Sequence, residues 1–224
     1  SLKLDTFPAT LQFVDDALSN QISLDTLLTS VDHKSRQLNN SQIFESLLIG
    51  LKHAIPDLSP RFNQHLREYY KFRHQYAEQI GILRQMLDKS PRNIPLLKEL
   101  AYALYNNGNT DDALMHFEEI LIYVPQDHES NLFLGNYYYV KGKQRMAKLD
   151  EDYHNIIAPS RMQYAEYRRT QQEIKKEELA LAAKYMEQAN QIKSTATIRN
   201  TLYDIYVLSA DATKAESIKP KMSK

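Results

Sequence analysis

The sequence predicts an all-α fold, an α-solenoid in which antiparallel helix pairs stack one after another. The chain of 224 residues holds only 5 Gly and 8 Pro. So few turn residues favour long helices with short connections over a sheet protein. Similar residues also recur every 34 positions, as the prolines at 91, 125 and 159 do. A fixed period of this length is typical of stacked helical hairpins.

The period is clearest between Asn93 and Asp127, where two helical patterns flank the turn 106–109 and Pro125 closes the unit. Apolar or aromatic residues repeat at the same spacing before and after this stretch: Leu66, Leu100 and Leu134; Tyr70, Leu104 and Tyr138. Gly108 and Gly142 match as well, which predicts a turn between paired helices at both positions.

These residues resemble the tetratricopeptide repeat family, whose pattern is carried here by Leu97, Leu100, Ala101, Leu104, Gly108, Ala113, Phe117, Ile120 and Pro125. The resemblance implies a right-handed superhelix with a concave face lined by the first helix of each pair. It implies about five units: 60–93, 94–127, 128–161, 162–195 and 196–224. In this family the concave face binds extended peptides or partner helices, and small residues such as Gly135 and Ala147 let paired helices approach closely.

Two regions follow the pattern less closely. Residues 1–59 form a helical segment, with helices expected near 11–18, 24–38 and 43–55, and a degenerate repeat is one interpretation. Residues 162–195 have no glycine at the expected turn. Either two helices meet near Lys175–Glu178, or one long helix runs from about 160 to 193. Two helices are favoured, because Tyr185 and Ala189 resume the pattern of a second helix.

Composition excludes several function classes. Lys plus Arg and Asp plus Glu both total 28, so the formal net charge is zero and gives no general attraction to nucleic acid. The chain has no cysteine, which excludes disulfides and thiolate metal sites. No apolar run is long enough to predict a membrane span. The compartment stays open between cytoplasm and, if a signal peptide was removed, the bacterial periplasm.

No nucleophile–base pair, zinc-protease motif or glycine-rich phosphate loop is present, so the sequence predicts neither an enzyme nor a cofactor. The best metal candidate is the acidic cluster Asp150, Glu151, Asp152 and His154. Asp150 and His154 are spaced i, i+4, as metal ligands on a helix often are. A solvated acidic face explains this cluster equally simply, and we predict no metal site.

A basic run with interleaved tyrosines comes next along the chain, as a nucleic-acid surface would require. It consists of Arg161, Arg168, Arg169, Lys175 and Lys176, with Tyr164 and Tyr167. Glutamates interrupt it throughout, at 166, 173, 177 and 178. A solvent-exposed face with alternating charges is therefore favoured, and no nucleic-acid partner is predicted.

Tyrosines suggest a partner-binding groove. Tyr70, Tyr138 and Tyr206 occupy a structural slot of the repeat and are expected in the core. The predicted groove, by register, consists of Lys71, Lys98, Tyr102, Tyr105, Asn136 and Tyr139. Tyrosine suits such a surface because it offers apolar area and a hydroxyl group. The alternative is that these tyrosines only fill space between helices. The lysine–asparagine clamp of chaperone-binding relatives is incomplete, since Tyr102 replaces an asparagine.

The sequence thus predicts a non-catalytic scaffold or adaptor that holds a peptide or a partner protein in its concave groove. Two alternatives stay open. The protein could be a self-assembling or complex-assembly subunit, which includes a homo-oligomer, because the ends of a solenoid expose apolar surface. It could also be a regulatory domain of a larger protein. Fold alone does not decide among them.

Overall fold

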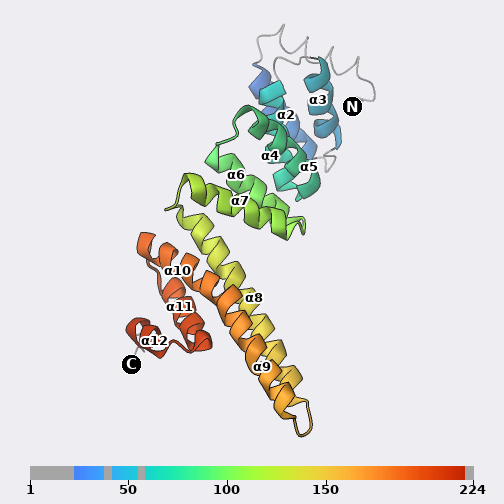
Figure 1. Cartoon of the computed structure of the whole chain (residues 1–224). Helices are drawn as coiled ribbons and strands as arrows, with labels where there is room; N and C mark the ends of the chain where they lie inside the picture. The colour runs from blue at the N-terminus through green and yellow to red at the C-terminus, as the bar shows by residue number, and fades with distance from the viewer. Residues whose placement is uncertain (1–22, 38–41, 55–58, 220–224) are drawn as a thin grey trace. The chain divides into compact units, whose positions relative to one another are not determined.

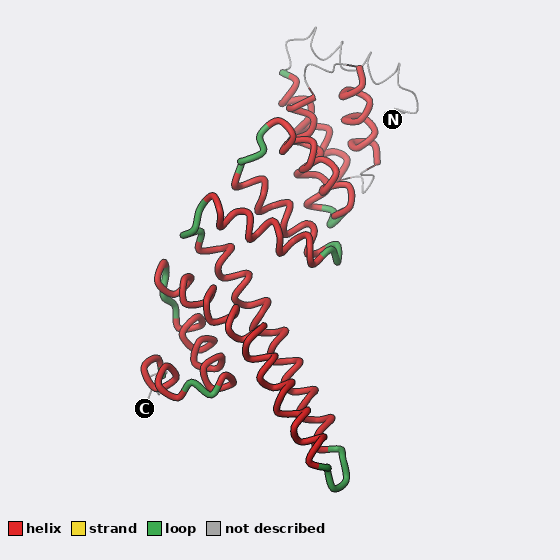
Figure 2. The backbone as a smooth tube through the Cα atoms, viewed as in Figure 1, coloured by secondary structure: helices red, strands yellow, loops and turns green. Residues whose placement is uncertain are grey.

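In the computed structural model, residues 23–37, 42–54 and 59–219 are described, and every regular element in these ranges is a helix (Figures 1 and 2). The predicted all-α solenoid of helical hairpins is confirmed. The helix expected at 11–18 lies outside the described residues. The chain divides into two compact units, an N-terminal unit (Ser1–Asn109) and a C-terminal unit (Thr110–Lys224), and each is described by itself.

Helices of the N-terminal unit each pack against the next one along the chain. They are α2 (Leu24–Gln37), α3 (Gln42–Ala54), α4 (Ser59–Phe72), α5 (Tyr76–Lys89) and α6 (Ile94–Asn106). The helices expected at 24–38 and 43–55 are therefore present as α2 and α3. A buried cluster of large apolar side chains joins α2 to α5, namely Leu28, Phe44, Leu47, Leu48, Leu51, Phe62, Leu66, Tyr69, Tyr70 and Ile82.

Local sequence explains where α6 begins and ends. The side chain of Asn93 accepts a hydrogen bond from the Leu96 N–H at 3.2 Å and caps the first turn. Pro95 stands in that turn, where its missing N–H costs nothing. After α6, Gly108 adopts a left-handed conformation with φ of 85°, which is a conformation that glycine reaches without steric cost.

Helices of the C-terminal unit differ strongly in length. They are α7 (Thr110–Tyr123), α8 (His128–His154), α9 (Arg161–Ile174), the π-helical segment η2 (Lys175–Leu179), α10 (Ala180–Ile192), α11 (Ala196–Ser209) and α12 (Ala212–Ile218). The 27-residue α8 runs antiparallel to the continuous helical stretch of α9, η2 and α10, and the two form one long hairpin (Figure 1). We call this the long hairpin.

The turn predicted at Gly142 is absent, because α8 passes straight through it. Gly142 is buried in the helix contact, and a Cβ added there would lie 2.8 Å from Leu179 Cδ2. The glycine therefore permits close packing and does not reverse the chain. The predicted contact role of Ala147 is also wrong, since its side chain is exposed. Beyond the glycine, Met146 and Leu149 continue the apolar stripe of the same helix.

The favoured interpretation of two separate helices in 162–195 is wrong as well. The chain is helical from Arg161 to Ile192, and its hydrogen-bond register changes at η2. Ile174 and Leu179 explain the change, because both are buried and they stand five residues apart. On an α-helix such residues would point about 140° apart, whereas the i→i+5 turn of a π-helix aligns them.

The last two helices of the chain pack on each other, α11 on α12. Asp211 caps α12 by accepting the Lys214 N–H at 3.0 Å, and Ala210 before it has a positive φ of 62°. A buried cluster joins α10, α11 and α12: Ala182, Met186, Ala189, Ile198, Leu202, Ile205, Tyr206 and Ala215. The helix ends inside 128–195 are thus corrected, while the boundaries of the five repeat units stay a prediction.

Candidate functional site

Four of the six predicted groove residues lie in the N-terminal unit. Lys71 is at the end of α4, and its ammonium is exposed and lies 3.9 Å from a carboxylate oxygen of Glu99. Lys98, Tyr102 and Tyr105 belong to α6. The first two are half-buried, and Tyr105 is 41% exposed. These residues provide hydroxyl and ammonium groups together with aromatic surface on α4 and α6.

Glu99 connects the three helices around these residues. Its carboxylate accepts a hydrogen bond from Gln79 Nε2 on α5 at 2.8 Å, and Arg67 Nε on α4 lies 3.7 Å away. The Glu99 side chain is only 16% exposed. A carboxylate with a cation or donor from each neighbouring helix holds α4, α5 and α6 in fixed positions. Lys71 therefore partly neutralises an internal acid, and its charge is not entirely available to a partner.

Asn136 and Tyr139 lie on α8 in the C-terminal unit. Asn136 is exposed, and Tyr139 is partly buried against the cluster that joins α10 to α12. The Tyr139 hydroxyl donates to Asp204 Oδ2 on α11 at 3.0 Å and accepts from Lys143 Nζ at 3.1 Å. This bonding raises the pKa of Lys143. Tyr139 thus has structural contacts that the sequence did not indicate.

Two residues of this surface were missed by sequence reasoning. Lys143 stands one turn after Tyr139 and lies 5.4 Å above its ring. Val207 of α11 is 54% exposed and stands two 34-residue periods after Tyr139. The same period that identified Tyr139 could therefore have found Val207. Lys143 could have been found from the i, i+4 spacing on a continuous helix.

Two of the three tyrosines predicted for the core are buried, Tyr70 at 4% and Tyr206 at 7% exposed. Tyr138 is half-buried and its ring stacks on that of Tyr185 at 6.1 Å. Burial raises the pKa of Tyr185 to about 12, and the nearby Glu118 carboxylate adds to this effect. Burial also raises the pKa of Tyr70 and Tyr206, whose hydroxyls donate to Glu45 and Glu187.

Within the described ranges, no group of three or more His, Asp and Glu side chains is placed to hold a metal ion. In the acidic cluster, Asp150 Oδ1 accepts the Tyr167 hydroxyl at 2.8 Å. His154 Nδ1 lies 2.6 Å from the backbone oxygen of Asp150 and does not meet its carboxylate. These two candidate ligands therefore serve other contacts, Asp150 with Tyr167 of α9 and His154 with the backbone of its own helix.

The basic run on α9 has alternating charges on its surface. Arg169 forms ion pairs with Glu166 at 2.8 Å and with Glu173 at 3.8 Å, both on the same helix. The Tyr167 ring stacks on Tyr153 of α8 at 4.3 Å and is therefore not available to a nucleobase. This segment is therefore a solvent-exposed helix face on which positive and negative charges alternate.

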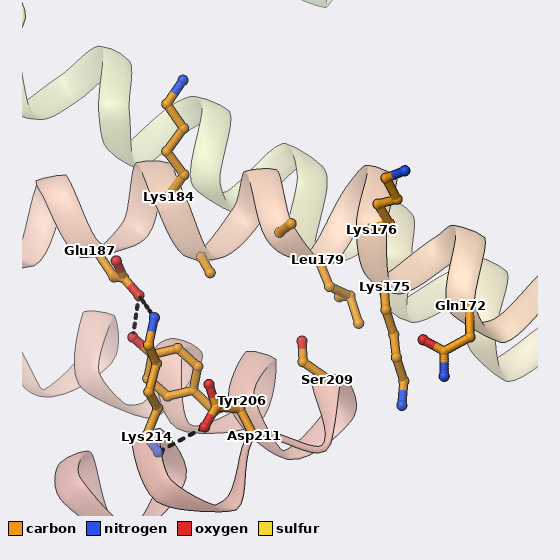
Figure 3. Close-up of a pocket in the computed structure, with 12 residues that line it drawn as sticks. Gln172, Lys175, Lys176, Leu179, Lys184, Glu187, Tyr206, Ser209, Asp211 and Lys214 are labelled. Atoms are coloured by element: carbon orange, nitrogen blue, oxygen red, sulfur yellow. Dashed lines mark hydrogen bonds and ion pairs between the residues drawn. The ribbon is translucent and has the colours of Figure 1, made fainter.

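Two pockets flank α10. The α10–α12 pocket has a volume of about 490 Å³ and is lined by residues that include Gln172, Lys175, Leu179, Glu187, Ser209 and Lys214 (Figure 3). The α7–α10 pocket has a volume of about 520 Å³ and is lined by residues that include Leu121, Ile122, Pro125, Lys184, Tyr185 and Gln188. One pocket is bordered by several charged side chains, and the other is mainly apolar.

Comparisons with known proteins give the fold. No protein-family model and no curated protein matches the chain. A solved structure from Bacteroides ovatus, whose name assigns it provisionally to protein binding, is similar with a TM-score of 0.65 and 24% identity over 84% of this chain and 98% of that one. A tetratricopeptide repeat protein from Parabacteroides merdae gives a TM-score of 0.44 and 15% identity over 85% of this chain and 75% of that one.

None of the helices in the described ranges is both long and apolar enough to cross a membrane. At 24% identity, the Bacteroides ovatus structure supports the arrangement of helices and not a shared activity. The chain therefore has the fold of an all-α solenoid of helical hairpins.

Proposed function

We propose that this protein is a non-catalytic scaffold that binds a peptide or a partner protein along the first helices of its hairpins. The binding residues are Lys71, Lys98, Tyr102 and Tyr105 on the N-terminal unit, and Asn136 and Tyr139 on the C-terminal unit. We call these residues, each set on its own unit, the first-helix strip. It offers aromatic area and hydrogen-bonding groups, which together are typical of protein-binding surfaces.

The observation that supports this proposal best is the hydrogen bond of 3.0 Å between Tyr139 and Asp204. It joins α8 directly to α11, so two successive first helices lie side by side in the C-terminal unit. The exposed Asn136 and Val207 then belong to neighbouring helices. A peptide lying across both helices would meet one amide, one tyrosine edge and one apolar side chain.

Site-specific photo-crosslinking tests this proposal. A photoreactive residue replaces Tyr105 or Asn136 in the full chain, and Tyr164 serves as a matched control because it is also an exposed tyrosine, 53% accessible, on α9. In an extract of the source organism, we expect the same polypeptide to be captured at positions 105 and 136 and not at 164. Equal capture at all three positions, or capture at 164 alone, would contradict a first-helix surface.

A second function, assembly with further copies of the chain, is favoured by one observation. Ile157 is 96% exposed and Met162 is 83% exposed at the loop end of the long hairpin. Such apolar side chains gain from being covered by another molecule. Sedimentation over a range of concentrations tests this function. Self-association that Ile157→Ser with Met162→Ser abolishes would support it, and a constant monomer mass would exclude it.

A further inference from the structure

The two pockets beside α10 share one residue, because Lys184 borders both. The α7–α10 pocket is apolar where Leu121, Ile122 and Pro125 line it, and Ile122 is 77% exposed. An isoleucine with that exposure gains free energy when another apolar side chain covers it. This surface differs from the first-helix strip, because no residue of that strip lines either pocket.

The α10–α12 pocket has an excess of positive charge. Four lysines line it, at 175, 176, 184 and 214, against the two carboxylates of Glu187 and Asp211, so the difference is two positive charges. Both carboxylates already serve the protein. Glu187 accepts the Tyr206 hydroxyl at 2.7 Å and Lys214 Nζ at 2.9 Å. Asp211 caps α12. Glu187 and the Lys214 ammonium are therefore paired with each other, and Asp211 is occupied by the Lys214 backbone N–H.

The lysines of η2 have no such partner. Within the described residues, neither Lys175 nor Lys176 has a carboxylate within 4.0 Å. The neighbouring acids face arginines, because Glu173 lies 3.8 Å from Arg169 and Glu177 lies 3.5 Å from Arg145. The η2 lysines are thus left with their charge available to a ligand.

Donor groups gather at the η2 end of this pocket. Figure 3 shows Lys175 reaching along the same side of the helix as Gln172, with the Ser209 hydroxyl across from them on α11. Lys175 is half-buried, which reduces competition from water. An ammonium, an amide and a hydroxyl near one another suit a carboxylate, which accepts several hydrogen bonds.

We propose that α10 binds an extended acidic segment of a partner protein. An apolar side chain of the segment occupies the α7–α10 pocket, and the backbone crosses α10 near Lys184. One or two carboxylates then reach Lys175 and Ser209 in the α10–α12 pocket, and Lys176 adds positive charge at its border (Figure 3). A helix with its side chains is about 10–12 Å wide. Lys175 also stands nine residues before Lys184, about 13 Å along the helix axis, so the path between the two pockets is roughly 17 Å. Since an extended chain advances about 3.3–3.6 Å per residue, the apolar residue and the first acid stand about five positions apart.

Fluorescence polarisation with defined probes tests this inference on the full chain. The probe is a labelled dodecapeptide of glycine and serine that contains one leucine followed, five positions later, by two glutamates. We expect binding that weakens with salt, as contacts between exposed charges do. A peptide with glutamines in place of the glutamates should bind about tenfold more weakly, and one with serine in place of the leucine should also lose affinity.

Matched variants locate the site. Lys175→Gln with Lys176→Gln should weaken binding of the acidic probe about tenfold. Lys148→Gln with Lys193→Gln removes the same charge from exposed lysines outside both pockets and should leave the affinity unchanged. Ile122→Ser should reduce the affinity for the leucine probe and not for the serine probe. Far-ultraviolet circular dichroism confirms that each variant is folded.

Several outcomes would overturn the proposal: equal losses in both lysine pairs, equal affinity for the glutamine peptide, or tighter binding of a single-stranded oligonucleotide than of the acidic probe. Tyr105→Ala separates this proposal from the proposed function. Unchanged affinity for the probe is expected. A loss would instead place the acidic peptide on the first-helix strip.

Discussion

One slot of the 34-residue period behaves differently in the two units. In the N-terminal unit it holds His74 and Gly108, with φ of 55° and 85°, and the chain turns at both. In the C-terminal unit it holds Gly142, which lies inside α8 and is buried. The α4–α5 hairpin therefore has helices of 14 residues each, whereas α8 has 27. A glycine in the same slot can mark either a turn or a close helix contact.

Neighbouring residues decide between the two. Asparagines flank Gly108, and one of them bonds the other across the turn at 2.8 Å. Such residues favour turns. Lysines flank Gly142, and lysine is a good helix former. The long hairpin thus results from strong helix formers around a glycine whose missing side chain makes room for Leu179.

The largest expected effects compare one buried slot in the two units. Leu100 is 2% exposed and Leu134 is 0% exposed, and they stand 34 residues apart. Leu100→Ala and Leu134→Ala should each lower the free energy of unfolding by about 2–5 kcal/mol, through lost burial and a cavity. Hydrogen exchange should increase most in α4–α6 for the first and in α8–α10 for the second. The same exchange pattern for both would contradict local packing units.

A smaller effect distinguishes Gly135, which packs closely against α10, from Gly81, which has open space around it. A Cβ on Gly135 would lie 3.0 Å from the backbone nitrogen of Met186, which cannot move aside easily. Gly135→Ala should therefore cost about 1–3 kcal/mol of stability. Gly81→Ala is the control, because its added Cβ meets nothing within 4 Å. That variant should gain about 0.5–1 kcal/mol, and thermal denaturation measures both. Stabilisation by both would show that α8 and α10 are not closely packed.

Alkaline pH provides the next comparison. Tyrosine has an unperturbed pKa of about 10, and burial raises the pKa of Tyr185 to about 12. Between these values the unfolded chain loses the proton and the folded chain keeps it, so stability falls as pH rises. Tyr185→Phe should reduce this fall between pH of about 10 and 12, measured by thermal denaturation. The exposed Tyr164→Phe is the control, and an identical pH dependence in both variants would contradict the burial of Tyr185.

The smallest effect concerns the contact between α8 and α11. Tyr139→Phe removes the hydroxyl that bonds Asp204 and Lys143 but keeps the ring packed. Because the contact is exposed, stability should change by less than about 1 kcal/mol. The NMR signals of residues around Asp204 should shift, whereas those of α12 should not. Unchanged spectra near Asp204 would show that the two helices are not joined there.

Much of the fold could be predicted from the sequence, because it depends on local patterns. The turn at Gly108 and the tyrosines 70 and 206 of the core follow from turn residues and period. The long hairpin could not be predicted from the 34-residue period. Its additional helical residues amount to about one repeat, so Pro159 still falls on the repeat spacing. Tyr138, Gly142, Met146 and Leu149 did contain the information, because steps of four, four and three residues keep one face of an uninterrupted helix.

The candidate site was less predictable, because it depends on contacts between distant residues. Register placed Asn136 and Tyr105 at exposed positions, but it could not show that Tyr139 bonds Asp204 of α11. The α10–α12 pocket is lined in part by η2, and no residue pattern predicts a π-helical turn as such. What the sequence does show is a pair of lysines at 175 and 176 where a turn was expected.

The continuity of α8 through Gly142 is tested most directly by a distance measurement. The sequence has no cysteine, so Asn136→Cys with Asp152→Cys gives two unique sites for spin labels. On one uninterrupted helix the two positions are 16 residues apart, which corresponds to about 24 Å. A continuous α8 should give a narrow distance distribution near that value by pulsed electron paramagnetic resonance. If the chain reversed at Gly142, the labels would lie on adjacent helices about 10 Å apart, and the long hairpin would be excluded.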